Sequence, residues 1–259
     1  MMQDTKIIET PAIGSGNNEP VVQIGNLFKS FGDNKVLLDF NLSLMKGENV
    51  VVLGKSGSGK SVLIKCIIGL LKPDSGTINV LGKNIADLSH NQLDELRAKV
   101  GFLFQSNALY DSMTIRENLE FPLRRHGKEK SKAEVNELVL EALSNVGLEN
   151  TVDMMPAELS GGMRKRISLA RTLILKPEII LYDEPTTGLD PITGREISKL
   201  MRDLAIKYDT SSIIISHDIN CVKMVADRIV MLINGICYAN GTFDELNKST
   251  DINIRTFFE

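Results

Sequence analysis

The segment at residues 54–61, with the sequence GKSGSGKS, constrains the fold of this chain more than any other. It follows an apolar run at 49–53 that is typical of a strand, and it precedes an apolar run at 61–71 that is typical of a buried helix. Glycines between a strand and a helix let backbone amides turn inward, and the first turn of the helix adds the positive end of its dipole. The segment therefore predicts a strand–loop–helix unit that binds phosphate.

The spacing of the glycines, the lysine and the serine is that of the P-loop. Lys60 is expected to reach the terminal phosphates of a nucleotide, and Ser61 is expected to ligate Mg²⁺. The backbone around the phosphates is expected to come from the rest of the loop, namely Gly54, Lys55, Ser56, Gly57, Ser58 and Gly59. A glycine-rich turn that matches by chance is the alternative, at about one chain in a hundred given a glycine usage of about 7%. The strand before the loop and the helix after it favour the nucleotide site.

Two adjacent carboxylates end the apolar run at 179–182. Asp183 is expected to hold Mg²⁺ through water, because a P-loop site needs a second element to place the metal. Glu184 would then orient or deprotonate the attacking water, which implies hydrolysis and not binding alone. The alternatives are an ordinary strand exit and a solvated acidic pair at a helix start. The apolar run and Pro185 both argue against the solvated pair.

Short runs rich in β-branched residues alternate with longer helix-like segments, which is the pattern of an α/β sheet. The runs lie at 49–53, 179–182, 212–216 and 228–233. Because three of them are nearly all apolar, we expect central parallel strands that are covered on both faces, with a ligand at their carboxyl ends.

The chain is expected to form one domain at 21–240. Within it, the stretch at about 107–165 has charge-rich amphipathic segments such as 131–146 and no strand-like run, so a helical subdomain is expected to be inserted in the sheet. Residues 1–20 lack the apolar run of a secretory signal and are expected to be a mobile arm. The tail at 241–259 carries apolar residues that would let it fold back as a helix or contact a neighbour.

Composition argues against several classes of protein. Hydrophobic residues make up 42% of the chain and charged residues 24%, close to the averages of soluble globular domains. A net charge of -3 with interspersed signs gives no basic field, so no nucleic-acid partner is expected. Cys66, Cys221 and Cys237 share no metal or redox spacing and are expected to be reduced thiols in a cytosolic setting. The apolar runs are far shorter than the roughly 20 residues of a spanning helix, so any membrane role would need a partner.

A second glycine-rich segment, Leu-Ser-Gly-Gly-Met at 159–163, precedes a helix-like run. Ser160, Gly161 and Gly162 would expose amides and a hydroxyl at a helix N-terminus, where they can bind phosphate; a helix cap without a ligand is the alternative. This segment resembles the signature of ABC ATPases, and the chain from 21 to about 241 follows the order of their motifs. The resemblance implies a P-loop NTPase (RecA-like) core with an inserted helical subdomain, which hydrolyses ATP with Mg²⁺. It also implies a homodimer of cassettes, in which the signature closes on the ATP held by the P-loop of the other subunit.

Several single residues take roles only through this resemblance. Gln105 matches the Q-loop, which contacts the metal and the attacking water and senses the membrane partner. His217 matches the switch histidine at the γ-phosphate, and Asp190 matches the D-loop, which crosses the dimer interface. The expected catalytic residues are therefore Lys60, Gln105, Glu184 and His217. Phe31 aligns with the aromatic residue that stacks on adenine, with Phe28 as the alternative.

Met163 departs from the glutamine that is more common at the end of the signature. Further segments resemble the Mla-type phospholipid transport ATPases, and they lie at 104–114, 118–124, 190–193 and 254–258. In that family the ATPase pair lies at the cytoplasmic face of the inner membrane and drives integral membrane permease subunits. A periplasmic lipid-binding subunit and a small cytoplasmic accessory subunit accompany them. The resemblance therefore implies phospholipid transport between bacterial membranes.

Three other functions are alternatives. The nearest is an ATPase of a lipoprotein-release or small-solute ABC transporter. A non-transport ABC protein that acts on nucleic acid or ribosomes usually has two cassettes, a long coiled-coil insert or basic arms, and the sequence shows none of these. A regulatory module that binds ATP without turnover is opposed by the presence of both Glu184 and His217.

Overall fold

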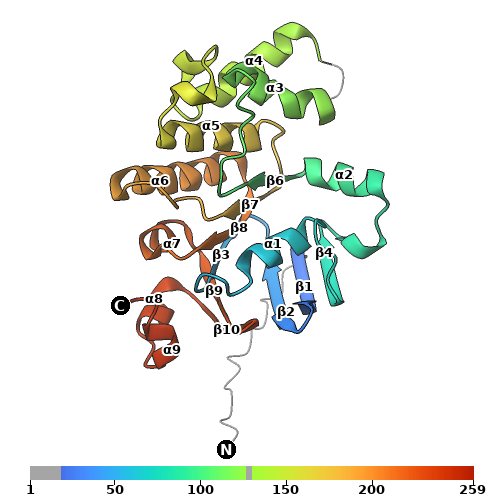
Figure 1. Ribbon diagram of the computed structural model, residues 1–259, viewed down its shortest axis with the longest axis vertical. Coiled ribbons are helices and arrows are strands. Elements are labelled where there is room, and N and C mark those ends of the chain that lie inside the picture. The colour runs from blue at the N-terminus through green and yellow to red at the C-terminus, as the bar shows by residue number, and fades with distance from the viewer. Residues whose placement is uncertain (1–18, 127–129) are drawn as a thin grey trace, which may run out of the picture. The chain divides into compact units, whose positions relative to one another are not determined.

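Figure 1 shows the computed structural model of the chain, which describes residues 19–126 and 130–259. Most of the arm expected at 1–20 therefore lies outside the described residues. The chain divides into two compact units. The first comprises the described residues up to Asp87 together with Ile215–Glu259, and the second comprises Leu88–Ile214.

The first unit contains an antiparallel sheet with the strand order β2–β1–β4–β5. The elements are β1 (Val22–Phe31), β2 (Asn34–Leu44), β4 (Ser75–Val80), β5 (Lys83–Asn84) and the 3₁₀ turn η1 (Ile85–Asp87). Val22 of β1 pairs with Leu44 of β2 on one side and with Val80 of β4 on the other. All three side chains are buried, so the register of the sheet brings apolar residues together in the core of the unit.

A second set of strands in this unit carries the predicted phosphate loop. β3 (Asn49–Leu53) runs parallel to β9 (Arg228–Ile233), and β10 (Ile236–Gly241) runs antiparallel to β9. Every residue of β3 is buried, which confirms the expectation of a strand covered on both faces. The helices of the unit are α1 (Lys60–Ile67), α7 (Ile219–Val225), α8 (Phe243–Asn247) and α9 (Ile252–Arg255).

Helix α1 is shorter than the predicted run at 61–71. It begins directly after the loop and ends at Ile67. Gly69 adopts a φ of 67°, and the amide of Leu70 donates a hydrogen bond to the carbonyl of Lys65 at 2.8 Å. This is the glycine-based ending typical of helix C-termini. The predicted end was wrong because the glycine stops the helix before the later proline turn, and Leu70 is 52% exposed.

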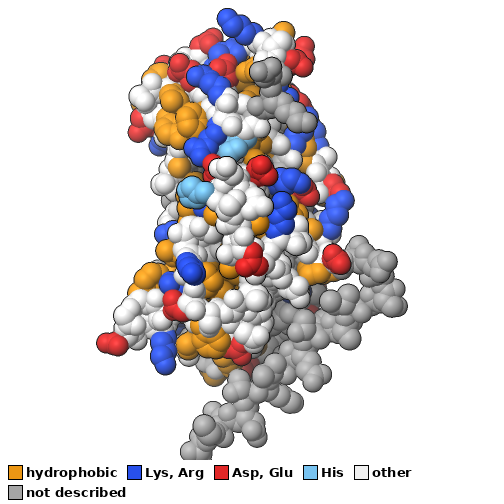
Figure 2. All heavy atoms as spheres, turned by 90° about the vertical axis from the view of Figure 1, so that its right-hand side faces the viewer, with side chains coloured by type: hydrophobic (Ala, Val, Ile, Leu, Met, Phe, Trp, Pro, Cys, Tyr) orange, Lys and Arg blue, Asp and Glu red, His pale blue; other side chains and the backbone are white. Residues whose placement is uncertain are grey.

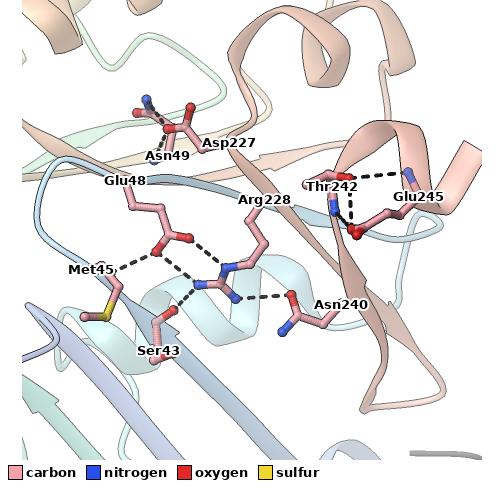
Figure 3. Close-up of polar contacts among 9 residues, drawn as sticks. All are labelled: Ser43, Met45, Glu48, Asn49, Asp227, Arg228, Asn240, Thr242 and Glu245. Carbon is pink, nitrogen blue, oxygen red and sulfur yellow. Dashed lines mark hydrogen bonds and ion pairs between the residues drawn. The ribbon is translucent and has the colours of Figure 1, made fainter. Parts of the chain in front are cut away.

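Arg228, the first residue of β9, connects several segments of the first unit (Figure 3). Its guanidinium donates hydrogen bonds to both carboxylate oxygens of Glu48, at 2.7 and 3.0 Å. It also donates to the carbonyl of Ser43 at 2.6 Å and to the side-chain oxygen of Asn240 at 3.2 Å. Arg228 thereby fixes the end of β2, the turn before β3 and the end of β10. The strand that leads into the phosphate loop starts from this network.

The second unit contains β6 (Val100–Leu103), β7 (Ile179–Asp183) and most of β8 (Ser211–Ser216). The last two residues of β8 belong to the first unit. β7 lies between β6 and β8 and runs parallel to β6, with Val100 paired to Ile179. Every residue of β7 and β8 is buried, as the apolar runs predict. The parallel strands and intervening helices confirm the α/β fold class.

Helices make up most of the second unit. They are α2 (His90–Ala98), α3 (Ile115–His126), α4 (Lys132–Ser144), α5 (Gly161–Leu173) and α6 (Pro191–Tyr208), with the 3₁₀ turns η2 (Glu149–Thr151) and η3 (Pro156–Glu158). Between β6 and β7, α3 and α4 pack on α5 (Figure 1). α5 continues past residue 165, the expected end of the helical subdomain, and the extent of that subdomain stays a prediction.

The surface in Figure 2 shows acidic and basic side chains interspersed, in keeping with the net charge of -3. Among the residues that the structure describes, no helix is long and apolar enough to span a membrane.

Candidate functional site

The phosphate loop packs its backbone closely against neighbouring strands of the first unit. Gly59 adopts a φ of 103°, and a Cβ at this position would lie 2.7 Å from Cγ1 of Val36 in β2. A Cβ at Gly54 would lie 2.7 Å from the carbonyl oxygen of Leu232 in β9. Both positions therefore exclude a side chain, and glycine keeps the close approach that the loop backbone needs.

Two polar side chains of the loop are suited to a ligand. Lys60 is 6% exposed, and its Nζ donates hydrogen bonds to the carbonyls of Gly54 at 2.6 Å and Lys55 at 3.1 Å. The Oγ of Ser58 is buried and has no hydrogen-bond partner among the described residues. Because an unsatisfied buried hydroxyl costs about 1–3 kcal/mol, an acceptor or donor on a ligand would be stabilised there. This arrangement fits the phosphates of a nucleotide, and Ser61, in the first turn of α1, stays the predicted Mg²⁺ ligand.

An open groove of about 590 Å³ lies beside the phosphate loop. Its volume is in the range of small-ligand sites, roughly 300–1,000 Å³. Its lining includes Val36 at the start of β2, Lys55 and Ser58 of the loop, Gly235 after β9, and Phe257 at the end of the chain. The groove is therefore large enough for a ligand that extends beyond the phosphates.

The remaining predicted residues of the first unit lie at strand ends. Phe31 ends β1 and is 48% exposed, with the Nζ of Lys29 5.2 Å from its ring centroid, and Phe28 is 37% exposed. Neither ring is among the described residues that line the groove, so the choice between them stays a prediction. His217 is exposed and follows β8, and Asp218 caps α7 directly after it. The role of His217 at the γ-phosphate also stays a prediction.

The carboxylate pair ends β7 in the second unit. Asp183 is 9% exposed and Glu184 is 8% exposed, so the alternative of a solvated acidic pair does not fit. Glu184 adopts a φ of 51°, a left-handed conformation that costs a residue with a Cβ roughly 1–2 kcal/mol. The hydroxyl of Thr187 donates to a carboxylate oxygen of Glu184 at 3.4 Å. Strained backbone of this kind clusters at functional sites, which supports a functional carboxylate at this position.

Lys165 of α5 is a buried cation beside the predicted Q-loop. Lys165 is 1% exposed, and its Nζ donates a hydrogen bond to the carbonyl of Gln105 at 3.1 Å. Burial lowers the pKa of Lys165 to about 8, while the charge of Asp183 acts in the opposite direction. Gln105 itself is exposed, so its backbone is held while its side chain stays accessible.

Two further residues of α5 hold the same loop. The hydroxyl of Ser168 donates to the carbonyl of Asn107 at 2.9 Å, and Arg171 donates to the carbonyls of Ala108 at 2.9 Å and Asn107 at 3.2 Å. Asn107 and Ala108 have φ values of 65° and 51°, so these bonds stabilise a left-handed turn. With Lys165 they lie at three-residue spacing along one face of α5. The helix that begins at the signature segment thus fixes the backbone of the predicted Q-loop.

The signature segment forms the start of α5. Ser160 is the N-cap residue, and its Oγ accepts a hydrogen bond from the amide of Met163 at 3.3 Å. The serine thus forms a helix cap, and its contact with a phosphate of a second subunit stays a prediction. A Cβ at Gly162 would lie 2.7 Å from Cγ2 of Thr193, whereas the nearest atom to a Cβ at Gly161 is 3.9 Å away. Packing therefore requires glycine at position 162 but not at position 161.

Asp190 caps α6 and positions the threonine that packs against the signature. Its carboxylate accepts hydrogen bonds from the amides of Ile192 and Thr193, both at 3.0 Å, and from the hydroxyl of Thr193 at 2.6 Å. These bonds, led by that from the Thr193 hydroxyl, lower the pKa of Asp190. Because Thr193 also meets Gly162, the predicted D-loop and the signature are packed together.

The predicted residues divide between the two units. The phosphate loop, Phe31 and His217 belong to the first unit, and Gln105, the carboxylate pair, the signature and Asp190 belong to the second. The sequence did not predict a role for Lys165, Ser168 or Arg171. Their contacts are non-local, and a single lysine, serine or arginine on a helix gives no distinctive pattern.

Residues 37–187 match the family model described as ABC transporter, and this range includes the phosphate loop, the signature and the carboxylate pair. The chain belongs to the ABC transporter family. It is an ATP-binding cassette ATPase that uses ATP with Mg²⁺, as the sequence predicts.

Three curated relatives and one solved structure illustrate the similarity. The probable ribonucleotide transport ATP-binding protein mkl of Mycobacterium leprae is 40% identical over 249 residues, which cover 95% of this chain and 72% of that protein. The intermembrane phospholipid transport system ATP-binding protein MlaF of Haemophilus influenzae is 36% identical over 242 residues, which cover 93% of this chain and 91% of that protein. The dimeric cassette MJ0796, in a post-hydrolysis state bound to ADP and Pi, is 33% identical to this chain, and the two structures have a TM-score of 0.78. The match covers 85% of this chain and 98% of the MJ0796 chain. In the Mycobacterium tuberculosis protein mkl, which is 41% identical, the match spans 66% of the relative's length.

Proposed function

We propose that this ATPase works as a homodimer that drives a membrane permease in transporting phospholipid between bacterial membranes. The observation that carries the proposal is the similarity to MlaF, which extends along 93% of this chain and 91% of that protein. It agrees with the resemblance of the segments at 104–114 and 254–258 to phospholipid transport ATPases. The dimer of MJ0796 supports the homodimer.

In this proposal, the described side chains take the roles expected from the sequence. Lys60 and the loop amides bind the phosphates of ATP, while Ser61 and Asp183 hold Mg²⁺, which neutralises phosphate charge when bound. Glu184 orients or deprotonates the attacking water. The burial of Glu184 and its left-handed backbone support this role, because residues with strained backbone cluster at functional sites.

The second unit supplies the parts that would connect ATP hydrolysis to transport. The start of α5 at Ser160 binds the phosphates held by the other subunit, and the hydrogen bond from Lys165 ties the same helix to Gln105. A movement of α5 on ATP binding would therefore also move the Q-loop, which senses the permease. This rigid connection supports a cycle in which ATP binding closes the two cassettes and hydrolysis reopens them.

The partners follow from the same proposal. Integral membrane permease subunits bind the ATPase pair at the cytoplasmic face of the inner membrane. A periplasmic lipid-binding subunit and a small cytoplasmic accessory subunit complete the complex. The support for these partners is the similarity to MlaF, which is named for intermembrane phospholipid transport.

A second candidate is an ATPase of a small-solute ABC transporter. Its support is the 40% identity to mkl, a protein named for ribonucleotide transport. The two candidates share the ATPase and differ in the permease and in the transported molecule.

Affinity purification of the tagged chain from cell membranes in mild detergent separates these candidates. The proposal predicts an integral membrane permease, a lipid-binding subunit and bound phospholipid, identified by mass spectrometry of proteins and lipid extracts. A solute permease without bound phospholipid would favour the second candidate. The tag alone serves as the background control. Recovery of the chain with no integral membrane protein above that background would contradict both candidates.

A further inference from the structure

Helices α5 and α6 lie side by side in the second unit (Figure 1). α5 begins after Ser160 of the signature segment, and α6 begins after Asp190 of the predicted D-loop. The first turns of the two helices meet at one point, because a Cβ at Gly162 would lie 2.7 Å from Cγ2 of Thr193. The methyl group of Thr193 therefore sets how closely the start of α6 approaches the signature segment.

Asp190 fixes the direction in which this methyl group points. The hydroxyl of Thr193 donates to one carboxylate oxygen of Asp190 at 2.6 Å. The other carboxylate oxygen accepts hydrogen bonds from the amides of Ile192 and Thr193, both at 3.0 Å. Because a threonine in a helix has few side-chain rotamers, a hydroxyl that is bonded to Asp190 also fixes the position of Cγ2. Asp190 thus acts on the signature segment through Thr193.

A second contact between the two helices lies one turn further along each of them. The guanidinium of Arg166 donates to a carboxylate oxygen of Glu196 at 2.8 Å. The side chain of Glu196 is 53% exposed, and an ion pair this exposed contributes little because water screens the two charges. The close contact between Thr193 and Gly162 therefore determines the register of the helices more than the ion pair does.

We propose that Thr193 is a positioning residue for closure of the dimer, because it holds the signature segment at a fixed distance from the D-loop. This proposal rests on the proposed homodimer, in which both segments reach the partner subunit at the same time. A displacement of one segment relative to the other then weakens the closed dimer. The affinity of a single chain for Mg-ADP stays the same, because the phosphate loop belongs to the first unit.

A double-mutant cycle between positions 162 and 193 tests the proposal. All variants carry Glu184→Gln to slow hydrolysis, and sedimentation velocity measures the Kd of the dimer in Mg-ATP. We expect Gly162→Ala to raise the dimer Kd about tenfold, because the new methyl group overpacks the contact with Thr193. Thr193→Ser removes Cγ2 and keeps the hydroxyl. Added to Gly162→Ala, it is expected to return the dimer Kd to within about threefold of the parent.

Two control variants separate the register of the helices from other effects. A Cβ at Gly161 would lie 3.9 Å from its nearest neighbour, a side-chain atom of Leu189, so Thr193→Ser should not relieve the effect of Gly161→Ala. Glu196→Gln removes the charge of the exposed ion pair on the same side of α6. We expect it to leave the dimer Kd within about twofold of the parent.

Thr193→Val tests the hydroxyl separately, because it keeps a methyl group beside Gly162 and removes the hydrogen bond to Asp190. We expect it to raise the dimer Kd about fivefold, and it also serves as the test if thermal melting shows that Gly162→Ala does not fold. Calorimetry should give the same Kd for Mg-ADP in every variant. A purely structural role would lower the melting temperature and leave the dimer Kd unchanged.

Two results would overturn the role of Thr193. One is a folded Gly162→Ala protein whose dimer Kd is not improved by Thr193→Ser, and the other is a Thr193→Val protein that dimerises as tightly as the parent. Absence of a dimer in the parent protein with saturating Mg-ATP would instead contradict the proposed homodimer.

Discussion

The Nζ of Lys165 donates a hydrogen bond to the backbone carbonyl of Gln105 at 3.1 Å, across 60 positions of the sequence. Lys165 belongs to the helix that begins at the signature, and Gln105 belongs to the loop expected to contact the metal and the attacking water. One buried lysine thus connects two segments that are expected to serve different nucleotides.

Lys165→Met is expected to lower the kcat of ATP hydrolysis about tenfold while leaving the affinity for Mg-ADP nearly unchanged. The substitution preserves apolar volume but leaves a carbonyl of the Q-loop without its donor, at a cost of about 1–3 kcal/mol. Steady-state kinetics and calorimetry of the same preparation separate the two effects. Lys99→Met removes a lysine whose side chain is 60% exposed and serves as the control. Equal kcat values for Lys165→Met and the wild type would show that the hydrogen bond does not position the Q-loop.

Gly162→Ala is expected to reduce the free energy of unfolding by about 1–3 kcal/mol, as overpacking does in other proteins. The new methyl group would lie 2.7 Å from Cγ2 of Thr193 and would force α5 and α6 apart. Gly161→Ala meets its nearest neighbour at 3.9 Å and should be neutral or slightly stabilising, because alanine favours a helix. Urea unfolding of both variants provides the comparison. Equal losses in the two variants would contradict this packing.

Arg228→Met is expected to destabilise the protein by roughly 2–4 kcal/mol, because it leaves the partly buried carboxylate of Glu48 without its cation. Arg125→Met removes an exposed arginine that pairs with Asp94 and should cost about 0–1 kcal/mol. Denaturant unfolding of the two variants measures the difference. A loss at Arg228 no greater than that at Arg125 would show that the network in Figure 3 contributes little.

Acid sensitivity should include a contribution from Asp74. Its carboxylate accepts hydrogen bonds from Lys29 at 2.8 Å and from the amide and hydroxyl of Ser30, both at 2.6 Å, and these lower its pKa to about 2. Since the unfolded chain has a pKa of about 3.9 at this residue, the contribution is complete above that pH and is lost as the pH falls to about 2. Asp74→Asn should therefore be less stable at neutral pH, with a shallower loss of stability between pH 4 and pH 2. Parallel pH profiles of the unfolding midpoint in the two proteins would rule out this contribution.

Local patterns predicted the central strands well. The apolar runs at 49–53 and 228–233 have the same bounds as β3 and β9, because strands covered on both faces are apolar at nearly every position. The predicted end of α1 lies too late, because the apolar run continues past Gly69 towards the next proline. Gly69 was the sequence signal that marks the end of the helix.

Contacts between distant segments were beyond the reach of such patterns. Nothing in the sequence near Lys165 indicates that its side chain meets the carbonyl of Gln105. The choice between Phe31 and Phe28 as the residue that stacks on adenine stays a prediction.

In the proposed mechanism, Glu184 activates the water that hydrolyses ATP. Phosphate release from Mg-ATP by the wild type and by Glu184→Gln, with Mg-ADP affinity measured on the same samples, tests this role. We expect the substitution to lower the rate about 100-fold or more while the affinity for Mg-ADP is retained, because general-base contributions are typically of this size or larger. Equal rates of phosphate release by the two proteins would contradict the claim.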